Sequence, residues 1–173
     1  MMNKKMMYTL VATVVIIVVV AAVAGTYVLM NSGGNTQNTV NVKDATSLQY
    51  DVNVTYQGTT TLSKFAAKNL GASDMMMRID LTGSGQSNYT YILNSEDKSA
   101  WLALNGNWTD VSTTYNNLMT SGPAAQWTTH VDALANWSGT GDCTYTDSAG
   151  TSYKIYNVAI NPTLDNSLFQ HTT

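Results

Sequence analysis

The chain has few cysteines, prolines, histidines and charges, and these shortages exclude several classes of protein. Cys143 is the only thiol among 173 residues, so no disulfide can form within one chain. It is either a small buried side chain or the partner of an intermolecular disulfide. His130 and His171 have no second His or Cys at ligand spacing, which argues against a zinc site. No acid pair or nucleophile stands out, so we expect no catalytic residues, no metal, no cofactor and no enzyme activity.

Charge is also scarce, at 11% of all residues. Residues 31–173 carry six basic and eleven acidic side chains, a formal charge of −5. This acidic balance disfavours nucleic-acid binding, which needs a basic surface. Polarity comes instead from 25 Thr, 17 Asn and 14 Ser, a composition typical of exported β-rich domains.

An uncharged run at residues 6–30 follows Lys4 and Lys5 directly, and the next charge is Lys43. Its last 22 residues would form a helix of about 33 Å, enough to cross a hydrocarbon core of roughly 30 Å. Lysines on one flank only predict a cytoplasmic N-terminus and an extracytoplasmic C-terminal part.

The alternative to this membrane anchor is a secretory signal cleaved after Ala24. We expect the anchor because apolar residues resume at 27–30, beyond the cleavage site. The predicted organisation is a cytoplasmic tail and transmembrane helix (1–30), a flexible Gly- and Asn-rich linker (31–42) and one β-rich domain (43–173).

Strands are predicted where apolar and polar residues alternate. In residues 47–57 the apolar positions Tyr50, Val52 and Val54 share one face, and Met75, Met77 and Ile79 share a face in residues 75–81. The other predicted strands are 60–68, 89–93, 100–104, 143–146 and 152–160. Asn105 and Gly106 tolerate the positive φ angles of a tight hairpin turn.

The apolar period becomes helical after residue 110. Tyr115 and Leu118 recur at helical spacing, and Pro123 opens a second helix, residues 123–137, whose apolar stripe includes Trp127, Val131 and Leu134. The predicted fold class is α+β: an N-terminal transmembrane helix, then five strands, two helices and two strands. About seven strands would form a curled, open-barrel-like antiparallel sheet with the helices packed on one side.

Four Asn-x-Ser/Thr triplets make Asn53, Asn88, Asn107 and Asn136 candidate N-glycosylation sites. Chance nearly explains their number, but each lies on the polar side of its element or beside a turn. The alternative is that they are ordinary exposed asparagines.

Aromatic and methionine side chains are the other functional candidates, because they adapt to flexible apolar ligands. A twisted sheet that curls without closing and is covered by a helix would form an apolar cavity. The alternative is an ordinary filled core. The expected cavity lining is Tyr50, Val52, Val54, Met75, Met77, Ile79, Tyr91, Trp127, Val131 and Leu134.

Three segments, MRIDL at 77–81, YILN at 91–94 and AWLALNGNW at 100–108, resemble the central strands of the LolA/LolB/LppX-type lipoprotein carriers. As an order of elements, the resemblance covers about residues 47–160. It implies an incomplete β-barrel curled around helices, with acyl chains carried in the cavity. Those carriers are released by cleavage or lipid-anchored through Cys, and this chain departs from that pattern.

The leading hypothesis is therefore a membrane-anchored extracytoplasmic domain that binds an apolar or lipidic ligand without catalysis. A second hypothesis is a structural or adhesive cell-surface protein, glycosylated and with a filled core. A third is the ectodomain of a sensing complex. The expected partners are the membrane and the ligand, with no nucleic acid.

Overall fold

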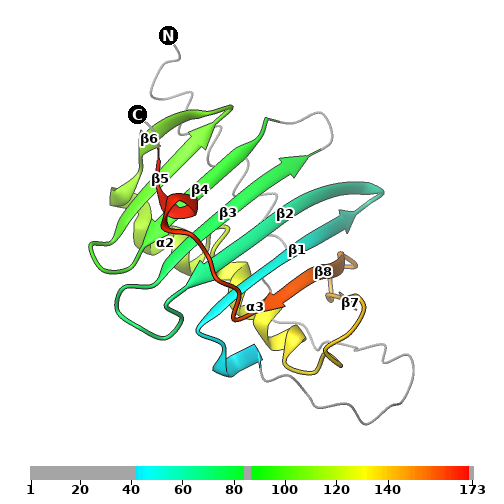
Figure 1. The fold of residues 1–173 in the computed structure, drawn as a ribbon. Helices are drawn as coiled ribbons and strands as arrows, with labels where there is room; N and C mark the ends of the chain where they lie inside the picture. The colour runs from blue at the N-terminus through cyan, green and yellow to red at the C-terminus, as the bar shows by residue number, and fades with distance from the viewer. Residues whose placement is uncertain (1–41, 84–86, 172–173) are drawn as a thin grey trace.

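A single antiparallel sheet of eight strands dominates the computed structural model, which describes residues 42–83 and 87–171 (Figure 1). The order across the sheet is β6-β5-β4-β3-β2-β1-β8-β7. The strands are β1 (Ser47–Tyr56), β2 (Thr59–Lys68), β3 (Met76–Gly83), β4 (Tyr89–Asn94), β5 (Ser99–Leu104), β6 (Asn107–Asp110), β7 (Cys143–Thr146) and β8 (Ser152–Ile160).

Hairpins join β1 to β6 in sequence order, as the alternating segments predict, and the chain then returns to the opposite edge. There β8 pairs antiparallel with β1, and β7 with β8. The β5–β6 turn has φ of 50° at Asn105 and 85° at Gly106, the left-handed conformation expected there. A bulge in the pairing of β1 with β8 includes Asn157, whose φ is 53°.

The predicted fold class is wrong in its strand count and in its barrel-like form. The structure has eight strands in one open sheet, with β6 and β7 as its two edges. The missed strand is β6, which is only four residues long and has no buried residue, so it carries no apolar alternation. Residues 1–41, which include the predicted transmembrane helix, lie outside the described residues. Within the described ranges, no helix is long and apolar enough to cross a membrane.

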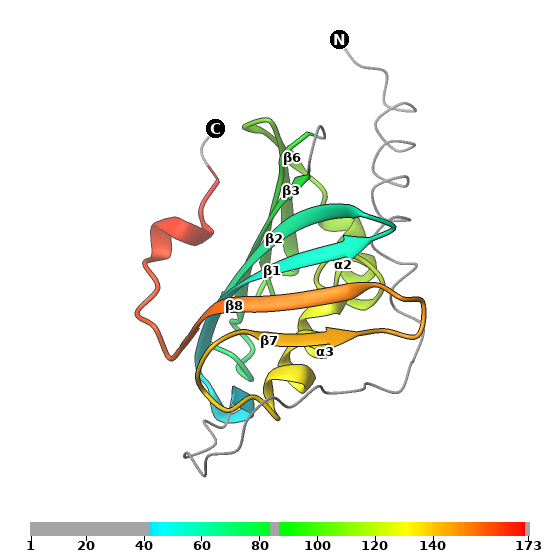
Figure 2. The ribbon, with the colours of Figure 1, turned by 90° about the vertical axis from the view of Figure 1, so that its right-hand side faces the viewer.

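Two short helices, α2 (Tyr115–Thr120) and α3 (Ala125–Leu134), cover one face of the sheet (Figure 2). We call this the inner face; Tyr50 and Val52 of β1 and Phe65 of β2 lie on it. The α2–α3 turn depends on Gly122, because a Cβ there would lie 2.7 Å from the Cα of Leu118. α3 is shorter than the predicted helix at residues 123–137.

The C-terminal segment crosses the opposite face of the sheet, here called the outer face (Figure 2). Phe169, in the short 3-10 helix Asn166–Phe169, is buried against Ala66 and Ile92. His171 stacks on Trp101, with ring centroids 3.6 Å apart. The apolar residues of this segment form a second core, separate from the one beneath the helices.

Arg78 fixes the C-terminal segment to β3. Its Nε and Nη2 donate to the two carboxylate oxygens of Asp80, both at 2.9 Å, and its Nη1 donates to the carbonyl of Leu168 at 3.2 Å. Thr90 donates to Asp80 from the neighbouring strand at 2.6 Å. The guanidinium is therefore shared between the sheet and the segment that covers it.

Candidate ligand-binding site

The inner face brings together all ten residues expected to line a cavity, in one apolar cluster with α2 and α3. The fully buried members are Tyr50, Val52, Met77, Ile79, Tyr91 and Leu134, and the partly buried ones are Val54, Met75, Trp127 and Val131. Alternation explains the grouping of the strand residues, since cross-strand partners such as Ile79 and Tyr91 point to the same side. In this structure the concave side is filled by the protein's own side chains.

An aromatic cluster at the centre of the inner face holds α3 against β1 and β2. The ring of Tyr50 stacks on Phe65 at a centroid distance of 5.1 Å, and Trp127 lies 5.3 Å from Tyr50. His130, one turn further along α3, meets Tyr50 and Phe65 edge-on at 5.6 and 5.1 Å. The helix therefore presents an indole and an imidazole to two stacked rings of the sheet.

His130 is the most unusual member, because it is polar and fully buried. Its Nδ1 lies 3.2 Å from the hydroxyl of Tyr50 and forms a hydrogen bond with it. Its Nε2 is buried and has no hydrogen-bond partner among the described residues. Burial lowers the pKa of His130 to about 3, so the imidazole is neutral at physiological pH. A buried polar atom of this kind needs a partner to offset its desolvation.

Burial holds two tyrosines of the inner face, like His130, in their neutral forms. Burial, together with Tyr145, raises the pKa of Tyr50, and burial together with Tyr89 raises that of Tyr91 to about 12. Neither these phenols nor His130 has a pKa near 7, where a general acid or base works best. The neutral imidazole and phenol groups can form hydrogen bonds with a ligand inside an otherwise apolar surface.

Neither Phe65 nor His130 is among the residues that the sequence patterns predicted for this cluster. Phe65 shares the inner face of β2 with Thr61 and Ser63, so the strand lacks a continuous apolar stripe that would mark it. His130 follows Trp127 by three residues, which is a neighbouring position on the same side of a helix. A histidine within one helical turn of a tryptophan on the apolar stripe was the available signal.

Cys143 lies on the inner face of β7 and is buried, which agrees with its interpretation as a small buried side chain. Its Sγ lies 3.8 Å from the carbonyl of Ala133 in α3, and burial raises the pKa of the thiol. Across the described residues, no group of three or more His, Cys, Asp or Glu side chains is arranged to hold a metal ion.

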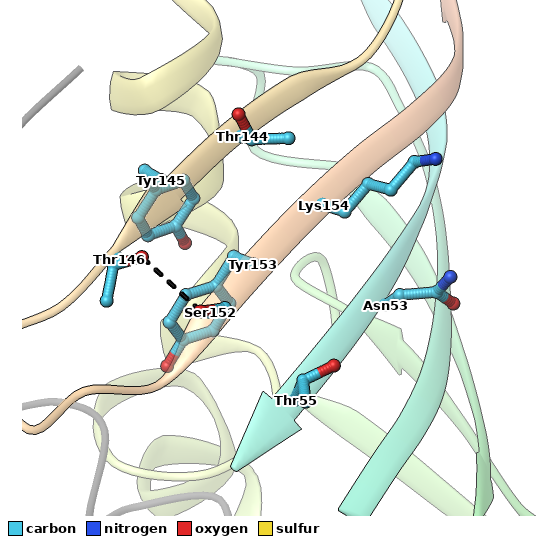
Figure 3. Close-up of a pocket in the computed structure, with 8 residues that line it drawn as sticks. All are labelled: Asn53, Thr55, Thr144, Tyr145, Thr146, Ser152, Tyr153 and Lys154. Atoms are coloured by element: carbon cyan, nitrogen blue, oxygen red, sulfur yellow. Dashed lines mark hydrogen bonds between the residues drawn. The ribbon is translucent and has the colours of Figure 1, made fainter. Parts of the chain in front are cut away.

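A groove of about 270 Å³, lined mainly by polar residue types, lies at the β7 end of the sheet (Figure 3). Its lining includes Tyr145 and Tyr153, which belong to the inner side of their strands. The remaining lining residues alternate with these and belong to the outer face: Asn53, Thr55, Thr144, Thr146, Ser152 and Lys154. Sequence analysis did not predict this groove, because it is formed by strands far apart in the chain.

The four candidate glycosylation sites differ in accessibility. Asn88, Asn107 and Asn136 are exposed, whereas Asn53 is half-buried in the outer groove. The Oδ1 of Asn53 accepts a hydrogen bond from the hydroxyl of Tyr156 at 3.3 Å. The three exposed asparagines therefore fit the predicted modification better than Asn53 does.

No protein-family model and no curated protein matches the chain. The resemblance to lipoprotein carriers therefore stays a prediction from three short segments.

Proposed function

We propose that this domain is a non-enzymatic binding module for a neutral, largely apolar ligand, which inserts between the inner face of the sheet and α3. The observation that carries the proposal is the buried Nε2 of His130, which lacks a hydrogen-bond partner within the described part of the chain. An oxygen or hydroxyl of the ligand would supply that partner. The proposal agrees with the resemblance to carriers of acyl chains.

The charges around the site support a neutral ligand rather than a fatty-acid anion. The basic residues of the strands, Lys64, Lys68, Arg78 and Lys154, all belong to the outer face. A carboxylate buried beside neutral His130 would have no cation to offset its desolvation. An alcohol or ester oxygen needs only one hydrogen bond, so we expect an acyl glycerol or another neutral lipid.

Entry of the ligand requires α3 to move, because side chains fill the inner face. The helix is ten residues long and is followed by residues 135–142, which form no regular element. Each buried methylene of the ligand would contribute about 0.8 kcal/mol, which offsets the contacts that α3 loses. From the sequence alone, we further propose that residues 6–30 anchor the domain at the extracytoplasmic side of a membrane.

Binding can be tested with a protein of residues 31–173 titrated with a pyrene-labelled monoacylglycerol and, separately, with pyrene-labelled palmitate. We expect the neutral lipid to bind more tightly than the anion. His130→Leu should weaken monoacylglycerol binding about tenfold, the equivalent of one hydrogen bond, whereas the control His171→Leu should leave it unchanged. Absence of binding by both lipids, together with no lipid in organic extracts of the purified protein, would refute the proposal.

A further inference from the structure

We infer that the polar groove on β1, β7 and β8 is a second binding site, which takes one ring of a neutral saccharide. The Tyr153 ring of its lining belongs to the inner face and lies 6.1 Å from the His130 ring, whereas the six polar side chains of this site are on the outer face. The inference therefore does not depend on the proposed lipid function, and either can fail without the other.

Strand register arranges the polar side chains of the groove as two rows of three. Thr144, Lys154 and Asn53 are cross-strand partners and form the first row. Thr146, Ser152 and Thr55 form the second. Neighbouring strands lie about 4.8 Å apart and alternate residues of a strand about 7 Å, so the grid measures roughly 10 by 7 Å. A single sugar ring is smaller than this grid, so hydroxyls on opposite sides of one ring can reach side chains of both rows through hydrogen bonds.

The chemistry of the lining matches a polyol. Each Ser or Thr hydroxyl both donates and accepts a hydrogen bond, and the Asn53 amide does the same through separate atoms, as sugar hydroxyls do. The hydroxyls of Thr146 and Ser152 already lie 3.4 Å apart, which places two such groups side by side (Figure 3). Hydrogen bonding of the three strands holds the grid in place, so little ordering is needed on binding.

The charge of the groove favours a neutral sugar over an acidic one. Lys154 provides the only cation of the described lining, and its Nζ forms an ion pair with Asp142 at 2.7 Å. The same Nζ lies 5.8 Å from the centre of the Tyr156 ring. The ammonium thus has an anionic partner already, and a uronic acid would have to compete with Asp142 for it.

The size of the groove limits the ligand. At about 270 Å³ it is slightly below the range of roughly 300–1,000 Å³ that is usual for small-molecule sites. One ring can occupy it, while the rest of a longer saccharide would extend over the exposed sheet. The aromatic ring of Tyr156, whose hydroxyl bonds Asn53, provides a flat apolar surface beside the polar grid.

The test uses the full chain made in a host without N-glycosylation, so that Asn53 is unmodified, in a detergent whose head group is not a sugar. Methyl glycosides of neutral hexoses and of the matching uronic acids are titrated by saturation-transfer NMR. We expect at least one neutral glycoside to bind and the uronic acids to bind more weakly. Thr146→Val and Ser152→Ala should each weaken binding about fivefold, the effect of one neutral hydrogen bond.

Three further variants test whether glycoside binding takes place in this groove. Thr82→Val, which changes an exposed threonine of the outer face on β3, should leave binding unchanged. Asp142→Asn removes the anion paired with Lys154 and should shift the preference toward the uronic acid. His130→Leu should have no effect. The inference is overturned if no neutral glycoside binds, if Thr82→Val weakens binding as much as Thr146→Val, or if Asp142→Asn leaves the preference unchanged.

Discussion

At the scale of single residues, His130 has a cost for folding and is the residue on which the proposed ligand binding depends. Its imidazole packs against the rings of Tyr50, Phe65 and Tyr153, and burial lowers its pKa to about 3. A leucine would fill the same position without leaving a polar nitrogen in the core. Retention of a polar group at such a place is expected where the nitrogen meets a ligand, because the ligand then supplies the missing hydrogen bond.

The burial of His130 should make the free energy of unfolding depend on pH. In the unfolded chain His130 takes up a proton near pH 6.5, whereas in the folded domain it does so only near pH 3. The folded state therefore binds fewer protons between these values, and its stability is full above pH 6.5 and falls as the pH is lowered. We expect a loss of about 1.4 kcal/mol per pH unit in urea unfolding measured from pH 6.5 to pH 4.

His130→Leu should remove this slope, although it also lowers stability at pH 7 by leaving the Tyr50 hydroxyl without its bond. His171→Gln is the control and should retain the slope. Asp97, Asp110 and Asp165 have pKa values lowered by hydrogen bonds from Ser99, Ser112 and Ser167, so their contributions are lost only below about pH 3.8. An unchanged slope in His130→Leu would show that the imidazole is not buried.

Gly122 is the residue on which the position of the helices depends. A methyl group at this position would lie 2.7 Å from the Cα and 2.9 Å from the carbonyl oxygen of Leu118, both backbone atoms that cannot rotate away. Gly122→Ala should therefore push α2 and α3 apart and lower the free energy of unfolding by about 1–3 kcal/mol. Asn116→Ala, at an exposed position of α2, is the control and should change it by less than about 0.5 kcal/mol. Equal stability of the two variants would contradict this role.

At the scale of elements, the C-terminal segment is an independent layer rather than a frayed end. Phe169 is 7% exposed, and the ammonium of Lys68 lies 5.0 Å from the centre of its ring. Lys68 also donates to Asn166, and Arg78 holds the Leu168 carbonyl. These contacts cover β2 to β5 on the outer face, so the sheet is buried on both sides over part of its width.

Phe169→Ala should release this segment. The loss of the buried ring should cost about 2–3 kcal/mol, and residues 162–171 should become faster in hydrogen exchange than in the parent protein. Gln170→Ala, at the neighbouring exposed position, should leave exchange in the segment unaltered. If exchange at residues 162–171 is already fast in the parent, the segment does not form a layer of the fold.

The elements also show what sequence patterns can and cannot determine. Seven strands were located within one or two residues because alternation is a local property, as in residues 47–57, where the structure has Ser47–Tyr56. Which strands pair with each other is not a local property of the sequence. The return of β8 to β1 and the outer groove beside it depend on residues about 100 positions apart, such as Asn53 and Lys154. The sequence does not predict either that Phe169 docks on the outer face, because an apolar side chain could be buried on either face of the sheet.

At the scale of the whole molecule, the two proposed sites are on opposite faces of one sheet. The lipid site needs α3 to leave the inner face, whereas the saccharide groove needs only rigid strands. The link between α3 and the sheet includes the contact of Cys143 on β7 with Ala133 on the helix. A covalent bond at this contact would hold α3 on the sheet and leave the outer face untouched.

Ala133→Cys tests this lock, because Ala133 is buried in the same apolar cluster as Cys143 and its backbone carbonyl lies 3.8 Å from the Cys143 sulfur. Thiol titration should show two free thiols in reduced protein and none after oxidation. If ligand entry requires displacement of α3, oxidation should slow uptake of the labelled monoacylglycerol about tenfold or more, and reductant should restore it. The same variant with Cys143→Ser cannot form the bond and should be insensitive to oxidant. Rapid uptake by fully oxidised protein would exclude α3 as the moving element and direct attention to α2, which lies beside it on the same face.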